Sequence, residues 1–136
     1  MKSLLFLWVS TLMIIQLHAQ DYAVVTNKNF NSLNVGQIKA LFLKKTSYLG
    51  DKLIVPLNLS SRNTVRLSFE KKVLHMSFSR LKSYWTKQHY LGHRPPISMK
   101  SEESIVAFIK KVDGAIGYMK LEKVDSSLKI VYEWSD

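Results

Sequence analysis

Apolar residues along the chain occur in two distinct patterns. Short, nearly continuous apolar runs predict four strands, at residues 22–25, 53–57, 115–119 and 128–132. Between these runs, apolar residues at helical spacing predict four helices. They begin after Asn34, at about residue 64, near Ser77 and after Ser101, and Gly92 ends the third. Strands that alternate with helices predict an α/β domain with a largely parallel sheet flanked by helices.

The apolar spacing also predicts which side chains of the first three helices face the core. In chain order they are Val35, Ile38, Leu41 and Phe42, then Val65, Phe69 and Val73, then Phe78, Leu81, Tyr84 and Trp85.

The first nineteen residues have the pattern of a secretory signal peptide. A basic start is followed by an uncharged run from Leu4 to Leu17, and Ala19 is the best cleavage point. The run is shorter than the roughly 20 residues that span a bilayer, although a retained membrane anchor is the alternative. Because no Cys follows it, a lipid anchor is not expected. We therefore predict a signal peptide at 1–19 and one periplasmic or secreted domain at 20–136.

The overall composition favours an anionic partner. The chain has 136 residues without cysteine, so it has neither a disulfide framework nor a thiolate metal site. It carries 20 Lys and Arg against 10 Asp and Glu, and such a surface attracts phosphate groups, nucleic acid, lipid headgroups or acidic proteins. Export makes intracellular nucleic acid a poor candidate.

The residues that could support catalysis or bind a metal do not form a recognisable site. His89 and His93 are four apart, but Gly92 argues against a continuous helix between them. Glu102 and Glu103 are adjacent and suit the first turn of a helix. No catalytic triad pattern, phosphate loop of the GxxxxGK type or HExxH motif is present. The sequence predicts a non-enzymatic protein without cofactor or metal.

Basic residues between 71 and 94 are interleaved with Tyr84, Trp85 and Tyr90, which is typical of single-strand nucleic-acid binding. However, Tyr84 and Trp85 share a helical face with Leu81, so core packing accounts for them better. We expect no nucleic-acid partner.

The segment between the second strand and the second helix combines polar donors with positive charge. A loop that leads into a helix offers free backbone N–H groups and the positive end of the helix dipole, which together bind anions. Ser, Thr and Asn are equally the commonest helix caps, so the cap and anion interpretations are both open from local chemistry. The candidate anion-binding residues are Ser60, Ser61, Arg62, Asn63, Thr64 and Arg66.

Four segments, in order, resemble the phosphate-type periplasmic substrate-binding proteins, specifically small single-lobe PstS-like relatives. They are SLNVGQIKALFLKK (32–45), LIVPLNLSSRNTVRLSFEKKVL (53–74), LKSYWTKQHYLGHRPP (81–96) and IVAFIKKVDGAIGYM (105–119). The resemblance implies one α/β lobe of a type 2 periplasmic-binding-protein fold that captures phosphate or a similar oxyanion.

The chain departs from the family's anion loop, which contains glycines and a leading Arg. Arg66 matches the Arg that ends the degenerate form of this loop, and Asn63 or Thr64 falls near its hydroxyl-bearing position. Asn58 or Leu59 stands where the leading Arg is expected, and Arg62 replaces a Gly, which restricts the backbone. With only one lobe, an anion would remain partly solvated and weakly held.

The alternative to an oxyanion-binding protein is an envelope interaction or sensor module that has lost its ligand. The sequence leaves open the oligomeric state and any dependence of a transporter on the protein.

Overall fold

The computed structural model describes residues 19–136. The predicted signal peptide, apart from Ala19, lies outside the described residues. None of the helices in the described range combines the length and the hydropathy of a membrane span. The elements follow in the order β1 (Asp21–Thr26), α1 (Val35–Phe42), β2 (Tyr48–Leu49), β3 (Lys52–Leu53), β4 (Val55–Leu59), α2 (Thr64–Lys72), α3 (Phe78–Tyr90), β5 (Ile97–Met99), α4 (Glu102–Lys111), β6 (Ala115–Lys120), η1 (Leu121–Lys123) and β7 (Lys129–Ser135).

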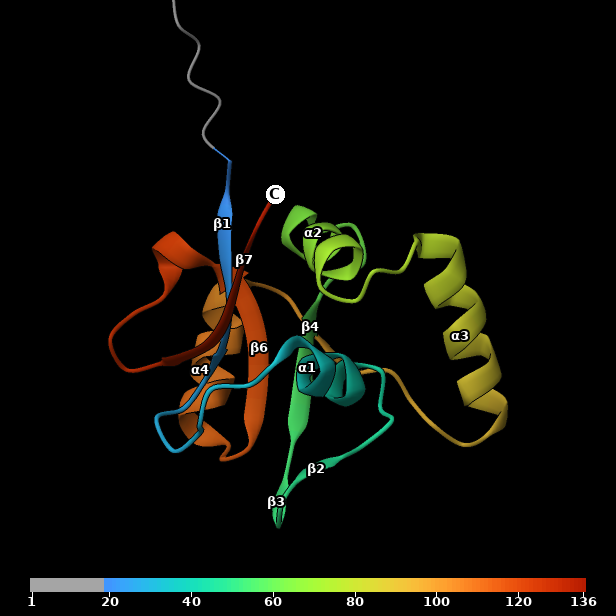
Figure 1. The fold of residues 1–136 in the computed structure, drawn as a ribbon, viewed down its shortest axis with the longest axis horizontal. Coiled ribbons are helices and arrows are strands. Elements are labelled where there is room, and N and C mark those ends of the chain that lie inside the picture. The colour runs from blue at the N-terminus through green and yellow to red at the C-terminus, as the bar shows by residue number, and fades with distance from the viewer. Residues whose placement is uncertain (1–18) are drawn as a thin grey trace, which may run out of the picture.

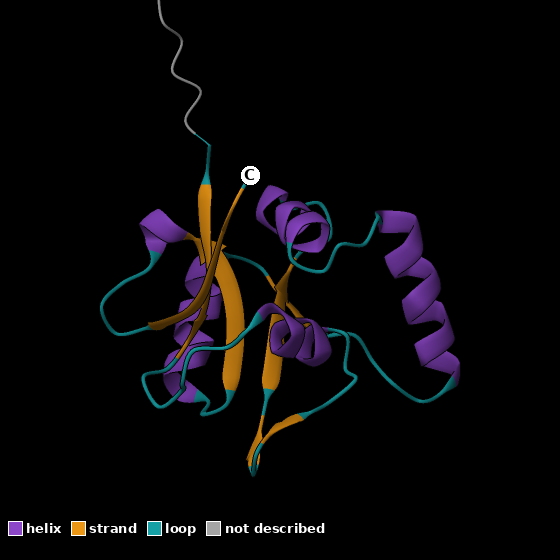
Figure 2. Cartoon of the chain, viewed as in Figure 1, coloured by secondary structure: helices purple, strands orange, loops and turns teal. Residues whose placement is uncertain are grey.

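A sheet of five strands in the order β5-β4-β6-β1-β7 forms the centre of the domain (Figures 1 and 2). Strand β4 is parallel to β5 and β6, whereas β1 is antiparallel to both β6 and β7. It follows that β4, β5, β6 and β7 run in one direction and only β1 is reversed. The predicted α/β class with a mostly parallel sheet is confirmed.

Helices cover both faces of the sheet, and β6 shows how its sequence allows this. Successive residues of a strand point to opposite faces. Tyr118 faces α1 and α2, because its ring lies 5.9 Å from that of Phe42 and stacks at 4.1 Å on Phe69. Gly117 faces α4, where a Cβ at this position would lie 2.5 Å from Ile105. The missing side chain of Gly117 thus lets α4 pack closely on one face of the sheet. On the other face, the ring of Tyr118 packs with the aromatic rings of α1 and α2.

The helix termini follow the capping residues of the sequence. Asn34 forms a capping box with Gln37 at the start of α1, and Ser101 caps α4 by accepting from the Ser104 N–H. Beyond α1, Lys44 has a φ of 57°, the left-handed conformation that usually requires glycine. The turn that closes this helix is therefore formed without glycine, at some cost in backbone strain.

Three expectations about the elements were wrong or incomplete. Leu53 belongs to the β2–β3 hairpin and is exposed, so the second sheet strand begins at Val55 and not at residue 53. Phe78 does not face the core, because it is the first residue of α3 and is 65% exposed. Strand β5 was not predicted, since three residues after two prolines give too short a pattern.

Helix α3 lies at the side of the domain, connected to the rest by two loops (Figure 1). Leu81 is the only residue of α3 that is fully buried, and Tyr84 and Trp85 are half-buried. The Tyr84 hydroxyl donates to the Leu43 carbonyl oxygen just beyond α1 at 2.5 Å. One hydrogen bond and one narrow apolar stripe thus attach this helix to the domain.

Candidate anion-binding site

The loop between β4 and α2 forms a turn that places Asn63 at the helix start. The Asn63 N–H donates to the Ser60 carbonyl oxygen at 2.9 Å, closing the turn. The Asn63 side-chain oxygen then accepts from the Val65 N–H at 2.8 Å, with Asn63 in an extended conformation. The cap interpretation of this segment is therefore confirmed, and Asn63 is the capping residue.

Capping leaves other donors of the loop free. The backbone N–H groups of Thr64 and Arg66 lie in the first turn of α2. No carbonyl oxygen of a preceding helical turn is there to accept from them. Ser60, Ser61 and Thr64 are exposed, and within residues 19–136 their hydroxyls form no hydrogen bond with the protein. These hydroxyl and amide donors lie at the positive end of the α2 dipole.

The two arginines of the segment are placed differently. Arg62 is exposed in the loop, where its charge is available to a ligand. Arg66 turns back toward the protein: its Nη1 donates to the Leu59 carbonyl oxygen at 2.8 Å and its Nε contacts the Glu70 carboxylate at 3.3 Å. The side chains of Arg66 and Glu70 are only 17% and 12% exposed. Glu70 therefore neutralises most of the charge that Arg66 would offer an anion.

Burial raises the pKa of the Glu70 carboxyl above its ordinary value, and the neighbouring Arg66 opposes that rise. Glu70 was not predicted to be part of the site. Its spacing of four residues after Arg66 on one helix is the signal that could have revealed the pair.

A buried hydrogen-bond network fixes the other side of the loop. The Tyr118 hydroxyl donates to the Asn58 side-chain oxygen at 2.8 Å and accepts from the Leu59 N–H at 3.2 Å. Arg66 meanwhile holds the Leu59 carbonyl oxygen. Both polar backbone groups of Leu59 are thus bonded to side chains at the point where the loop begins. The loop is held in place before any ligand arrives.

Asn58 occupies one of the two positions where the resemblance placed a leading Arg. Its amide is buried and its side-chain oxygen is bonded to Tyr118. Asn58 therefore holds the start of the loop through its bond to Tyr118, and it presents no charge to solvent.

A hollow of about 250 Å³ adjoins the loop, between α2 and α3. Ser61 and Arg66 line it together with Lys82 and Trp85 of α3. Lys82 was not predicted to lie beside this loop, because only the packing of α3 against the domain brings them together. Lys82 adds a cation beside the segment, where Arg66 is largely neutralised.

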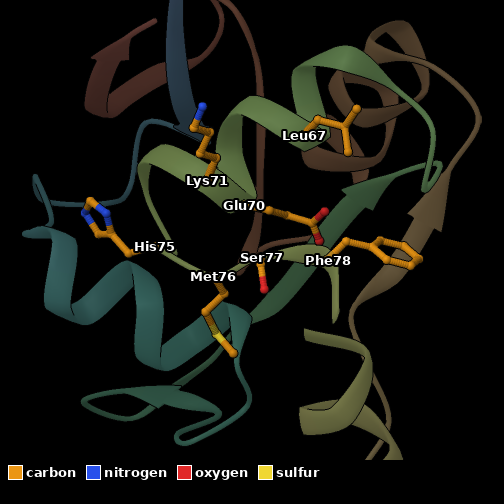
Figure 3. A pocket seen from close by; sticks show the side chains of 7 residues that line it. All are labelled: Leu67, Glu70, Lys71, His75, Met76, Ser77 and Phe78. Carbon is orange, nitrogen blue, oxygen red and sulfur yellow. The ribbon is translucent and has the colours of Figure 1, made fainter. Parts of the chain in front are cut away.

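A larger hollow of about 510 Å³ lies on the far side of Glu70, toward the C-terminal end of α2 (Figure 3). It is lined by Leu67, Glu70, Lys71, His75, Met76, Ser77 and Phe78. Its surface is mainly apolar, and the Glu70 carboxylate gives it an acidic wall. Despite its size, it does not suit a small anion.

Within residues 19–136, no cluster of three or more His, Asp or Glu side chains could hold a metal ion. His89 lies on α3 and His93 lies beyond its end at Tyr90. The expected break between these histidines is confirmed.

Comparison with known proteins supports the fold but not a function. No family model and no curated protein matches the sequence. Among solved structures, the chain is similar to a protein assigned as a phosphate ABC transporter substrate-binding protein, with bound phosphate, from Clostridium perfringens (20% identity, TM-score 0.68). It is also similar to an ABC-type phosphate transport receptor from Vibrio cholerae (15%, 0.68) and to PstS from Borrelia burgdorferi (13%, 0.61).

These matches cover 83% of this chain but only 44%, 46% and 47% of the three structures. The chain spans less than half the length of each. The described residues therefore have the fold of one periplasmic-binding-protein lobe.

Proposed function

We propose that this protein is an exported, non-enzymatic solute-binding protein that weakly binds phosphate or a similar oxyanion at the N-terminus of α2. The observation that carries the proposal is the braced β4–α2 loop, which presents unpaired hydroxyl and amide donors at a helix N-terminus. The fold supports it, since two of the similar structures are a phosphate ABC transporter substrate-binding protein and a phosphate transport receptor.

In this proposal the candidate residues have separate roles. Backbone N–H groups of the first turn and the hydroxyls of Ser60, Ser61 and Thr64 bind the oxyanion. Arg62 and Lys82 supply positive charge, while Asn63 caps the helix. Arg66 orients the loop through Leu59, because Glu70 offsets its charge.

The affinity should be low for two physical reasons. The site is open on one side, so solvent screens each contact. The one arginine that is partly buried is already paired. We expect a dissociation constant in the high micromolar to millimolar range, on the order of 4 to 6 kcal/mol of binding free energy.

Calorimetric titration with phosphate and sulfate tests this affinity. The double variant Arg62→Ala with Thr64→Ala should lose the thermal stabilisation that phosphate gives the wild-type protein. A control with Arg94→Ala and Thr86→Ala removes the same residue types elsewhere and should keep it. Sub-micromolar binding, or equal stabilisation of both variants, would contradict the proposed site.

A second candidate function is an envelope interaction or sensor module that has lost its ligand. The neutralisation of Arg66 by Glu70 and the exposure of Leu67 and Phe78 beside the apolar hollow favour it. Recovery of a stoichiometric partner from envelope extract would support this function if phosphate, sulfate and molybdate all left the melting temperature unchanged.

A further inference from the structure

A second concentration of positive charge lies away from the α2 N-terminus, in a cleft between α1 and α3. The cleft has a volume of about 510 Å³. Four cationic side chains line it: Lys39 and Lys45 from α1 and the turn beyond it, and Arg80 and Lys87 from α3. Within the described part of the chain, none of the four forms a salt bridge. Among residues 19–136, no Asp or Glu lines the cleft.

The sequence explains why the wall formed by α3 carries no carboxylate. Between residues 71 and 101 there is neither Asp nor Glu, whereas the whole chain has 10 of them. The same segment contains seven of the 20 basic residues: Lys71, Lys72, Arg80, Lys82, Lys87, Arg94 and Lys100. The positive charge around α3 is therefore not neutralised from within its own segment.

One face of α3 borders the cleft. Residues 80, 83, 84 and 87 share one helical face, and all four line the cleft. On this face Arg80, Ser83 and Lys87 are exposed and Tyr84 is half-buried, so both cations are open to a ligand in the cleft. The Tyr84 hydroxyl, bonded to the Leu43 carbonyl oxygen, holds the two walls together while the cations remain solvated.

The floor of the cleft is apolar, formed by Leu43, Leu74 and Met76. The volume is within the range of about 300–1,000 Å³ typical of sites for small organic ligands. Four cations around an apolar floor suit a molecule with several negative charges and an apolar body. A lone inorganic phosphate would leave most of both features unused.

The backbone beside the cleft is strained at two points. Lys44 and His75 have φ values of 57° and 52°, and they are the only non-glycine residues with positive φ among those described. Lys44 lies between Leu43 of the floor and Lys45 of the wall, and His75 lines the cleft directly. Residues held in sparsely populated backbone conformations cluster at ligand sites. The two strained residues lie at the same cleft as the four cations.

We infer that the α1–α3 cleft binds an organic anion with two or more phosphate-type charges, independently of the oxyanion site at α2. The cations bind the charged groups and the apolar floor contacts the body of the ligand. The chemistry is that of a phosphate ester or polyphosphate ester, for which ATP is a suitable probe.

Titration of the purified protein with ATP and with inorganic phosphate at low ionic strength tests the inference. ATP should bind the wild-type protein at least about tenfold more tightly than phosphate. Arg80→Gln with Lys87→Gln should reduce ATP affinity by at least about tenfold, because two solvated charge contacts are lost. The matched control Lys28→Gln with Lys111→Gln removes the same net charge from residues outside the cleft, and should change the affinity less than about threefold.

Equal weakening in both variants, or no preference for ATP over phosphate, would overturn the inference. A measurement on the unaltered protein avoids any folding defect. ATP should protect Lys39, Lys45 and Lys87 from an amine-acetylating reagent and leave Lys28 and Lys111 reactive, as read by mass spectrometry. Uniform protection, or none at the cleft lysines, would also overturn it.

Discussion

Replacing Tyr118 with Phe removes one hydroxyl group from beneath the candidate anion loop. That hydroxyl accepts from the Leu59 N–H at 3.2 Å and donates to the Asn58 side-chain oxygen at 2.8 Å. Tyr118 is fully buried, so Tyr118→Phe leaves a buried donor and a buried acceptor without their partner. The ring and its stacking on Phe69 at 4.1 Å are retained.

The expected cost follows from these two orphaned groups. A buried polar group left without a hydrogen bond costs about 1–3 kcal/mol, so the two together should destabilise the protein by about 2–6 kcal/mol. A total stability of about 5–15 kcal/mol is usual for a domain. With a urea dependence of about 1–3 kcal/mol/M, the midpoint of urea unfolding should fall by about 2 M.

The assay is urea unfolding followed by circular dichroism, with phosphate titration of the folded variant alongside. Tyr132→Phe serves as control, because the Tyr132 hydroxyl forms no hydrogen bond within the described residues. It should change the stability by less than about 0.5 kcal/mol. If Tyr118→Phe is as stable as this control, the loop is not braced by the network and the reasoning is refuted.

Three further predictions concern backbone strain and ionisation. Lys44→Gly should stabilise the protein by about 0.5–1 kcal/mol in urea unfolding, because relief of the left-handed conformation exceeds the entropy cost of glycine; Lys44→Ala should bring no such gain. Gly114→Ala should destabilise the protein by at least about 2 kcal/mol, because its φ is +88° and a Cβ would lie 2.2 Å from the Leu53 carbonyl oxygen. Gly50→Ala is the control: its Cβ would meet no atom within 4 Å, so it should cost only about 1 kcal/mol. Burial and the bond to a carboxylate raise the pKa of Tyr22 from 10.0 to about 12, so its contribution to stability should be complete below pH 10 and lost as pH rises through about 12, as spectrophotometric titration of the phenol will show.

The elements that the sequence predicted well are those fixed by local chemistry. Asn34 and Ser101 cap their helices as expected, because a cap depends on residues three or four positions away. The fold class followed from the alternation of short apolar runs with apolar residues at helical spacing along the chain. These signals need no knowledge of distant contacts.

The errors lie where distant contacts decide the outcome. Phe78 has the spacing of a core residue, but α3 packs on the domain through Leu81 and leaves Phe78 exposed. The bond between Tyr118 and Asn58 joins residues 60 apart in the sequence, so no local pattern could reveal it. Lys82 is one of the basic residues between 71 and 94, and only the placement of α3 brings it beside Ser61.

For the candidate site, the sequence identified the segment but not the roles of its two arginines. Both were expected to supply charge to an anion. The structure leaves Arg62 exposed and pairs Arg66 with Glu70 and with the Leu59 carbonyl oxygen. Whether Glu70 competes with an anion for Arg66 depends on the directions of the two side chains. Their spacing along the helix suggests these directions but does not determine them.

The most direct test of the central proposal is a phosphate titration followed by the chemical shifts of backbone amides. Binding at the N-terminus of α2 predicts that the largest, saturable shifts fall on the amides of residues 61–66, with half-saturation in the high micromolar to millimolar range. Shifts confined to other parts of the domain, or none in 61–66 at saturating phosphate, would contradict the account.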